Sequence, residues 1–248
     1  MSEARITEPK SSLSLLAGIV DRPSATLAEV TARPRWRWVL PMTLAILATI
    51  ASAVVAAPFL AAEAKLQMAA VLSRLPAEQL AQMPKQMAMF QTPLFVGASA
   101  ALTGILALLI GYLLQAAALY FGSLIAGGEI NFGRLFAATP WVGLPFVLET
   151  VMQTVYVAVK GKLVINQGLS YLVSTGSRTA DAGSLAYAAL GMLTLFWLWH
   201  LLLSFKLLRV GPRLGGGAAF FVTLLYAALS VGMRAGFAAL SRMTSFSM

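Results

Sequence analysis

The chain lacks cysteine, has a single histidine and carries few charged residues among its 248 positions. The absence of cysteine excludes disulfide bonds, thiolate metal sites and lipid anchors on cysteine. One histidine, His200, is too few for a two-histidine zinc site. Charged residues make up 11% of the chain, whereas soluble domains carry roughly 25%, so the composition does not predict a water-soluble fold.

Five long apolar segments with almost no charge dominate the chain instead. They are Trp38–Ala62, Pro93–Ala126, Leu135–Val159, Ala182–Phe205 and Leu214–Met233. A helix needs roughly 20 apolar residues to cross a bilayer, and each segment reaches that length. Because the segments are apolar on all sides and do not alternate as membrane strands do, we predict an all-α, polytopic integral membrane protein with five transmembrane helices. The lipid bilayer is then its first partner.

Three regions follow from this pattern. Residues 1–35 are expected to form a short amphipathic segment at the cytoplasmic membrane surface, residues 36–241 a five-helix transmembrane domain, and residues 242–248 a short tail. The first region has charges of both signs at its start and no cleavage site after an apolar run of signal-peptide length. We therefore expect no cleaved signal peptide.

The N-terminal region contains two predicted short helices. Leu13, Leu16 and Val20 recur at helical spacing and, with the adjoining Leu15 and Ile19, make one apolar stripe. Pro23 suits the first turn of a second helix, and Pro34 marks its end. Such a stripe indicates either a helix that lies on the membrane or a helix that docks on a protein, and the sequence leaves both interpretations open.

Basic and aromatic residues gather where the apolar segments meet water. The residues predicted to contact lipid headgroups or a partner protein are Arg33, Arg35, Trp36, Arg37, Arg134, Lys206, Arg209 and Arg213. The net charge is +9, but the basic residues flank membrane segments, so we predict no nucleic-acid partner. The dense cluster before the first segment favours a cytoplasmic N-terminus.

Small residues share one face of the second apolar segment. Gly104 and Gly111, with Ala100 and Ala107, recur at helical spacing. A stripe of this kind lets another helix approach closely. We therefore predict helix packing at the two glycines, or contact there with a second copy of the chain.

Glu149 is the most costly residue of the predicted membrane segments, because an acid inside a bilayer is unfavourable by a few kcal/mol. It could bind a proton or a cation, or it could be held by Gln153, by a carbonyl group that Pro145 frees, or by a facing hydroxyl. Pro140 and Pro145 also predict a kink or a break in the same segment.

Gln115 and His200 are expected to reach a similar depth in the membrane, because alternate segments run in opposite directions. A contact between their side chains is therefore feasible. Glu149 falls on the opposite half of the membrane, so a pair with His200 is not expected. A second interpretation, which we favour on sequence alone, places His200 at the membrane surface beside Trp197 and Trp199.

The sequence contains no HExxH, P-loop or GxSxG motif. We therefore predict no catalytic residue, no metal and no cofactor. A transporter or permease subunit that uses Glu149 and the broken third segment is the second hypothesis. Transporters usually pair broken helices in two related halves, whereas this sequence predicts a break in the third segment only.

Several short pieces follow one another in a recognisable order along most of the chain. They are Gly18-Ile19-Val20-Asp21-Arg22-Pro23, Arg33-Pro34-Arg35-Trp36, Leu75-Pro76-Ala77-Glu78-Gln79-Leu80, Gly127-Gly128 with Phe132, Pro140 and Pro145, and the run from Trp199 through Arg209 to Arg213. In this order, and with five membrane segments, the chain resembles the bacterial branch of the Yip family, the Ypt/Rab-interacting membrane proteins.

The resemblance implies a five-helix membrane domain without catalysis, with a cytoplasmic N-terminus, in a bacterial inner membrane. Eukaryotic members of the wider family bind Rab-type GTPases and act in vesicle traffic. The N-terminal region of this chain, residues 1–35, is much shorter than theirs, so GTPase binding is not carried over. The function that we expect is a membrane-organising or partner-binding scaffold.

Overall fold

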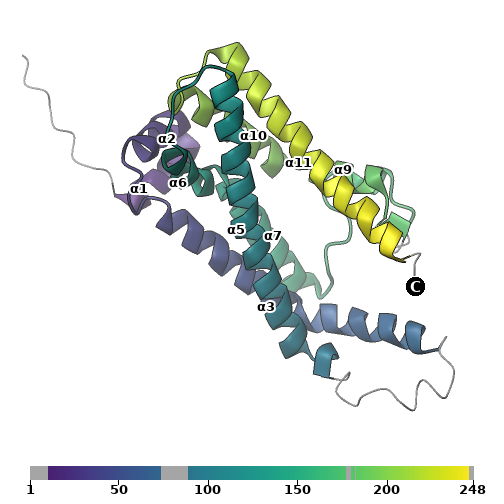
Figure 1. The fold of residues 1–248 in the computed structure, drawn as a ribbon. Coiled ribbons are helices and arrows are strands. Elements are labelled where there is room, and N and C mark those ends of the chain that lie inside the picture. The colour runs from purple at the N-terminus through teal and green to yellow at the C-terminus, as the bar shows by residue number, and fades with distance from the viewer. Residues whose placement is uncertain (1–10, 74–88, 177–179, 182, 246–248) are drawn as a thin grey trace, which may run out of the picture. The chain divides into compact units, whose positions relative to one another are not determined.

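The computed structural model describes residues 11–73, 89–176, 180, 181 and 183–245, and these residues form helices and connections without any strand. The elements (Figure 1) are α1 (Ser12–Asp21), α2 (Pro23–Ala32), α3 (Val39–Leu72), α5 (Pro93–Ile125), α6 (Phe132–Val142), α7 (Leu144–Lys160), the 3-10 turn η2 (Ser170–Leu172), α9 (Leu185–Met192), α10 (Leu195–Val210) and α11 (Gly216–Ser245). The predicted short helix that begins at Pro76 lies outside the described residues.

Four stretches of helix are long and apolar enough to cross a membrane. They are Val39–Ala69, Pro93–Ile125, Phe132–Lys160 and Gly216–Ala239. A fifth crossing requires α9 and α10 together, and this pair is bent by 64°. The predicted all-α membrane class is therefore confirmed.

The described chain divides into two compact units, and each is described by itself. The first unit contains the described residues up to Met42, together with Tyr112–Leu144 and Trp199–Leu229. The second contains Thr43–Gly111, Pro145–Leu198 and the described residues from Ser230 onward.

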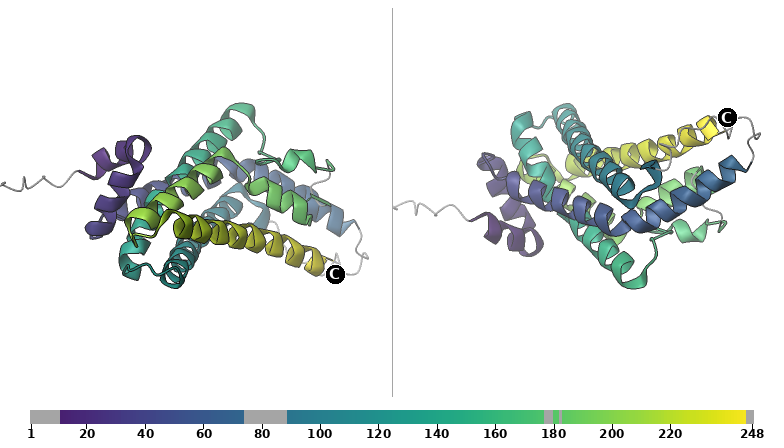
Figure 2. Two further views of the ribbon diagram at one scale, coloured as in Figure 1. Left: turned by 90° about the horizontal axis from the view of Figure 1, so that it is seen from above. Right: turned by 90° about the horizontal axis from the view of Figure 1, so that it is seen from below.

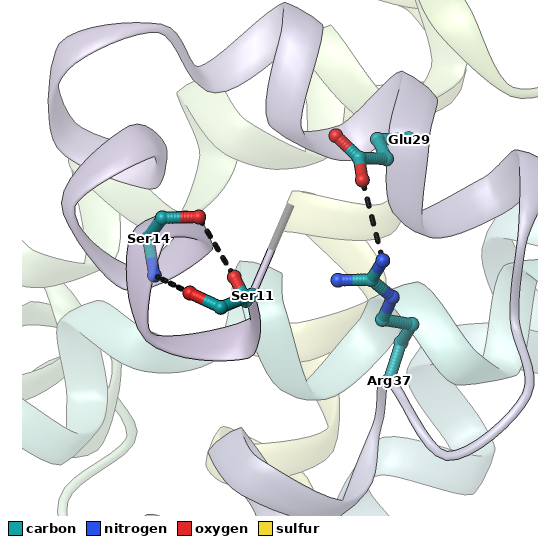
Figure 3. Close-up of polar contacts among 4 residues, drawn as sticks. All are labelled: Ser11, Ser14, Glu29 and Arg37. Carbon is teal, nitrogen blue, oxygen red and sulfur yellow. Dashed lines mark hydrogen bonds and ion pairs between the residues drawn. The ribbon is translucent and has the colours of Figure 1, made fainter. Parts of the chain in front are cut away.

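In the first unit, α1 and α2 form a hairpin in which α2 packs on α6 (Figures 1 and 2). Helix α1 begins after Ser11, whose side-chain oxygen accepts a hydrogen bond of 3.2 Å from the backbone N–H of Ser14 (Figure 3). Only Arg22 separates the two helices, and Pro23 occupies the first turn of α2, as the sequence predicted. The two helices can approach closely because Gly18 has no Cβ. A Cβ at this position would clash with the side chain of Thr26.

Only one side of the predicted stripe of α1 packs. Leu15 and Ile19 are 1% and 2% exposed, whereas Leu13 and Val20 are 71% and 66% exposed. Leu16 packs partly against the core. Helix α1 is apolar on more than one side, so helical spacing alone could not show which side would dock.

The core of the first unit draws on α1, α2, α5, α6, α10 and α11. Its buried members are Leu15, Ile19, Leu27, Val30, Leu119, Leu135, Ala138, Trp141, Val142, Leu203, Leu207, Leu208, Leu214, Ala219 and Val222. Trp141 is fully buried, and its indole N–H donates a 3.0 Å hydrogen bond to the carbonyl oxygen of Arg37. The N-terminal hairpin therefore shares one core with helices that lie far from it in the sequence.

In the second unit, α3 and α5 approach closely at two glycines of α5. A Cβ added to Gly104 would lie 2.7 Å from Cγ2 of Thr49, and one added to Gly97 would lie 2.9 Å from Cβ of Ala57. Packing at Gly104 is thus confirmed, because small residues let helix backbones come together in lipid. Gly111 is exposed and has open space where a Cβ would stand, so no described helix packs on it, and its contact with a second copy of the chain stays a prediction.

We expect Gly104→Leu to destabilise the protein by about 1–3 kcal/mol, because overpacking forces closely spaced helices apart. Gly111→Leu is the matched control, since it adds the same side chain to the same helix in open space. Thermal unfolding in detergent micelles measures both. Equal losses in the two variants would contradict the packing assigned to Gly104.

Candidate functional site

A polar cavity of about 260 Å³ lies in the second unit. Its polar lining includes Glu149 and Gln153 of α7, Gln167 of the following connection, Thr194 before α10 and Arg234 of α11. Pockets for drug-sized ligands span about 300–1,000 Å³. The cavity is therefore sized for a small ligand, and it brings a carboxylate and a guanidinium to one place.

Glu149 is half-buried and has few protein partners for its carboxylate. The amide N–H of Gln153 donates to Oε1 of Glu149 at 3.4 Å, which confirms the predicted tie between them. This distance is long for a hydrogen bond, so the tie is weak. The hydroxyl of Thr194 donates a second hydrogen bond, and Arg234 adds electrostatic attraction. The remaining acceptor capacity of the carboxylate faces the cavity.

Thr194 reaches Glu149 because the fourth span is broken in front of it. The sequence predicted one continuous fourth span over Ala182–Phe205, with a break in the third span only. The fourth span is broken as well, so the expectation of a continuous fourth span is wrong. Helix α9 ends at Met192, and α10 begins at Leu195 with Thr194 as its cap, whose hydroxyl oxygen accepts from the backbone N–H of Trp197 at 3.0 Å. A hydroxyl that caps a helix satisfies a donor that the helix itself leaves free.

The connection after α7 satisfies a backbone carbonyl group at the end of α9, where the fourth span is broken. The N–H of Leu169 donates to the carbonyl oxygen of Leu190 at 3.0 Å. Gly168 has a φ of +52°, and a Cβ there would lie 2.8 Å from the carbonyl oxygen of Leu193. Glycine alone tolerates both the backbone conformation and this close approach.

The same connection is fixed by polar contacts outside the spans. The hydroxyl of Tyr187 donates to the carbonyl oxygen of Ile165 at 2.8 Å. Asp181 accepts from the backbone N–H of Thr175 at 2.8 Å and from the hydroxyl of Ser174 at 2.7 Å. These hydrogen bonds, with the one from Thr175 foremost, hold the pKa of Asp181 below its usual value.

The predicted interruption of the third span is confirmed. Gly143 separates α6 from α7. Pro145 lies in the first turn of α7, where its missing N–H is not needed. A Cβ at Gly143 would lie 2.6 Å from the ring of Tyr112. The aromatic ring therefore packs against the backbone at the interruption.

The first unit contains a separate buried polar network centred on His200, which is 1% exposed. Its Nδ1 lies 2.9 Å from the carbonyl oxygen of Val142, and its Nε2 lies 3.0 Å from the hydroxyl of Tyr226 and 3.2 Å from the amide nitrogen of Gln115. The feasible contact between Gln115 and His200 is thus present. The favoured interpretation of His200 as a membrane-surface residue is wrong, because tertiary packing encloses the ring.

The geometry of this network assigns the imidazole proton. A carbonyl oxygen only accepts, so Nδ1 carries the hydrogen, and Nε2 accepts from Tyr226 and Gln115. The hydroxyl of Ser204, in turn, donates to the carbonyl oxygen of His200 at 3.0 Å. Both ring nitrogens are occupied by the protein, so the network joins α5, α6, α10 and α11 and offers no free group for chemistry.

The basic residues before the first span have different environments. Arg37 donates to Glu29 at 3.3 Å, and both side chains are largely buried, so Arg37 belongs to the fold (Figure 3). Trp36 is 77% exposed with a φ of +43°, and Arg33 and Arg35 are also exposed. Within the predicted contact set, the free surface at this point consists of Arg33, Arg35 and Trp36.

The remaining basic candidates belong to the first unit. Arg134 and Arg213 line the same pocket of about 650 Å³, together with Glu129. Lys206 is half-buried and Arg209 is exposed, and neither lines this pocket. The structure therefore brings together two of the predicted contact residues from turns far apart in the sequence.

Sequence reasoning predicted Gln153 or an unnamed facing hydroxyl as a partner of Glu149, and it missed Arg234. Arg234 marks the end of the fifth apolar segment and was used only as a flanking charge, and Thr194 and Gln167 had no signal in any motif. Tyr226 was also missed, because a tyrosine inside an apolar segment does not indicate a partner for histidine. Only an estimate of which helices are neighbours could have found these residues.

A model of the Yip1 domain family matches residues 17–236 of the chain. The chain belongs to this family. The match extends from α1 into α11, so it includes the polar cavity and the His200 network of this Yip1-domain protein. The match, together with the apolar helices, confirms an integral membrane protein of the Yip family. Comparison with curated proteins and with solved structures gave no significant match.

We expect His200→Leu to destabilise the Yip1-domain protein, because it removes the buried hydrogen bonds that Gln115 and Tyr226 make to the imidazole, at about 1–3 kcal/mol for each buried polar group that loses its bond. The double variant His200→Leu/Gln115→Leu removes one of the stranded groups and should lose less than the sum of the two single losses. Unfolding in micelles measures all three variants. Strictly additive losses would show that the two side chains do not interact.

Proposed function

We propose that this Yip1-domain protein is a non-catalytic membrane scaffold that binds a partner protein through the outer face of α1. The observation that carries the proposal is the exposure of Leu13 and Val20 on a helix whose opposite side is packed. Leu15 and Ile19 anchor the opposite side of α1 in the core. A rigid helix with a free apolar face is suited to docking a partner.

Burying the exposed apolar face of α1 against a partner would lower the free energy of the complex. Removing apolar surface from water stabilises a complex by about 25 cal/mol for each Å², and Leu13 and Val20 both have most of their surface available. The hairpin is held at the same time by Trp141 and by the ion pair of Arg37 with Glu29. Little ordering is then needed on the scaffold side, and preorganisation of this kind favours affinity.

The proposal includes a cytoplasmic N-terminus in a bacterial inner membrane. Its support is the exposed Arg33 and Arg35 beside Trp36, which suit anionic headgroups on the cytoplasmic side, and the resemblance to the bacterial branch of the family. The absence of catalysis is supported by His200, whose two ring nitrogens are both occupied internally.

Self-association is a further part of this proposal. Helix α5 exposes Gly111 together with apolar neighbours such as Ile110 and Leu114. A small residue on an apolar helix face lets a second helix approach closely. The face around Gly111 is therefore the surface that we propose for contact with a second copy of the chain.

A transporter or permease subunit is the second candidate, and one observation favours it. The break between α9 and α10 contributes Thr194 to the polar cavity that Glu149 faces. Broken helices beside an intramembrane acid are typical of solute pathways. With the interruption at Gly143, two of the crossings are broken.

A photo-crosslinker at Leu13 or at Val20 should capture a specific membrane or cytoplasmic protein in native membranes. Both positions are exposed, so a probe there can reach a partner. Mass spectrometry identifies the adduct, and a probe at the exposed Leu106 of α5 is the control for general lipid contact.

The double variant Leu13→Asp/Val20→Asp should abolish capture by a probe at the neighbouring Ser14 and leave folding unchanged, because both substituted side chains are exposed. Capture that survives this variant, or lipid adducts alone at Leu13 and Val20, would contradict the scaffold proposal.

The transporter hypothesis is tested by Glu149→Gln in proteoliposomes. The substitution keeps the shape of the side chain and removes its charge, so it should abolish solute flux in a transporter and leave capture at α1 unchanged in a scaffold. Flux that is present in the wild type and persists in the variant would remove Glu149 from the pathway.

A further inference from the structure

We propose that the cavity between Glu149 and Arg234 binds a small zwitterion, with the ammonium group of the ligand on the carboxylate of Glu149 and its acidic group on the guanidinium of Arg234. This inference goes beyond the scaffold function. It concerns binding at equilibrium, so it does not depend on whether the protein moves the ligand across the membrane.

The first argument is that the two opposite charges share a cavity without neutralising each other directly. Both residues line the same space of about 260 Å³. Arg234 attracts the carboxylate of Glu149, but no direct ion pair joins these two described residues. Two opposite charges that line one small cavity form a site for a ligand that carries both a positive and a negative charge.

The second argument is that hydrogen bonds with neighbouring side chains orient each charged group. Gln167 accepts a hydrogen bond of 3.2 Å from Nη2 of Arg234. A Cβ on the buried Gly191 would lie 3.7 Å from that same nitrogen, so the guanidinium passes over the end of α9. On the other side, Gln153 and Thr194 donate to the carboxylate of Glu149. Charged groups held in this way lose little freedom when a ligand binds.

The third argument concerns which ligands the cavity disfavours. A simple cation would be attracted by Glu149 but repelled by Arg234. A simple anion would be attracted by Arg234 but repelled by Glu149. Glu149 is half-buried and Arg234 is exposed, and charges at such a partly solvated site still interact more strongly than in bulk water, so the net charge of the ligand matters here. A ligand with both charges satisfies both residues and adds no net charge to the cavity.

The remaining lining sets the size and the character of the ligand. Phe146, Met192 and Trp197 supply apolar surface beside the polar groups. The volume lies below the range of drug-sized sites. A short carbon skeleton that carries an amine and an acid, of the size of a small amino acid, matches this combination.

The test uses the purified full-length protein in detergent micelles and three isotope-labelled probes of nearly equal size. L-alanine carries both charges, ethylamine only the positive one and propionate only the negative one. Equilibrium dialysis should show L-alanine bound at least tenfold more tightly than either single-charge probe. Equal binding of the three probes, or no binding of L-alanine, would overturn the proposal without any variant being needed.

Variants then assign the two charged groups. Glu149→Gln and Arg234→Gln should each weaken L-alanine binding by about ten- to hundredfold, the effect expected for loss of a hydrogen bond to a charged group. Asp21→Asn and Arg22→Gln are the controls, because these two opposite charges are exposed and lie outside the cavity. Unchanged binding in either cavity variant would overturn the assignment, as would equal losses in the controls.

A second arm identifies the source of the zwitterion. The dialysis is repeated in nanodiscs of phosphatidylglycerol with and without phosphatidylethanolamine, whose headgroup is zwitterionic. Competition by phosphatidylethanolamine would assign the site to a lipid headgroup, and undiminished L-alanine binding would assign it to a soluble solute. Neither result depends on capture of a protein at α1, so this inference and the scaffold proposal can fail separately.

Discussion

A polar group in a membrane protein must find its partner within the protein, because lipid offers none. This constraint acts most clearly where α9 gives way to α10. The interruption frees backbone carbonyls, and the connection after α7 covers one of them through the N–H of Leu169. Thr194 satisfies a donor at the start of α10. The bend of 64° is therefore stabilised by contacts that also build one wall of the polar cavity.

The two buried polar clusters meet the same constraint in opposite ways. The network around His200 is closed, because every ring nitrogen has a partner from another helix or from the backbone. The group around Glu149 is open, since its carboxylate accepts one long hydrogen bond from Gln153 and one from Thr194 beside a cavity. A closed network stabilises a single arrangement of helices, whereas an open one leaves capacity for a ligand.

The N-terminal hairpin follows the same logic. Its inner residues complete a core with α6 and α10, and Arg37 contributes a backbone carbonyl to Trp141 and a side chain to Glu29. An arginine next to tryptophans ordinarily indicates headgroup contact. Here the same residue is part of the fold, which leaves Arg33, Arg35 and Trp36 as the exposed cluster.

The sequence by itself determined the membrane class, the position of most spans, the two N-terminal helices and the interruption of the third span, because length, apolarity and proline act locally. It also marked Glu149 as costly. Only the tertiary structure decided the break in the fourth span, the burial of His200, the docking side of α1 and the meeting of Arg234 with Glu149. These features depend on which helices are neighbours, and helices that are apolar on every side do not encode their neighbours in the spacing of their residues.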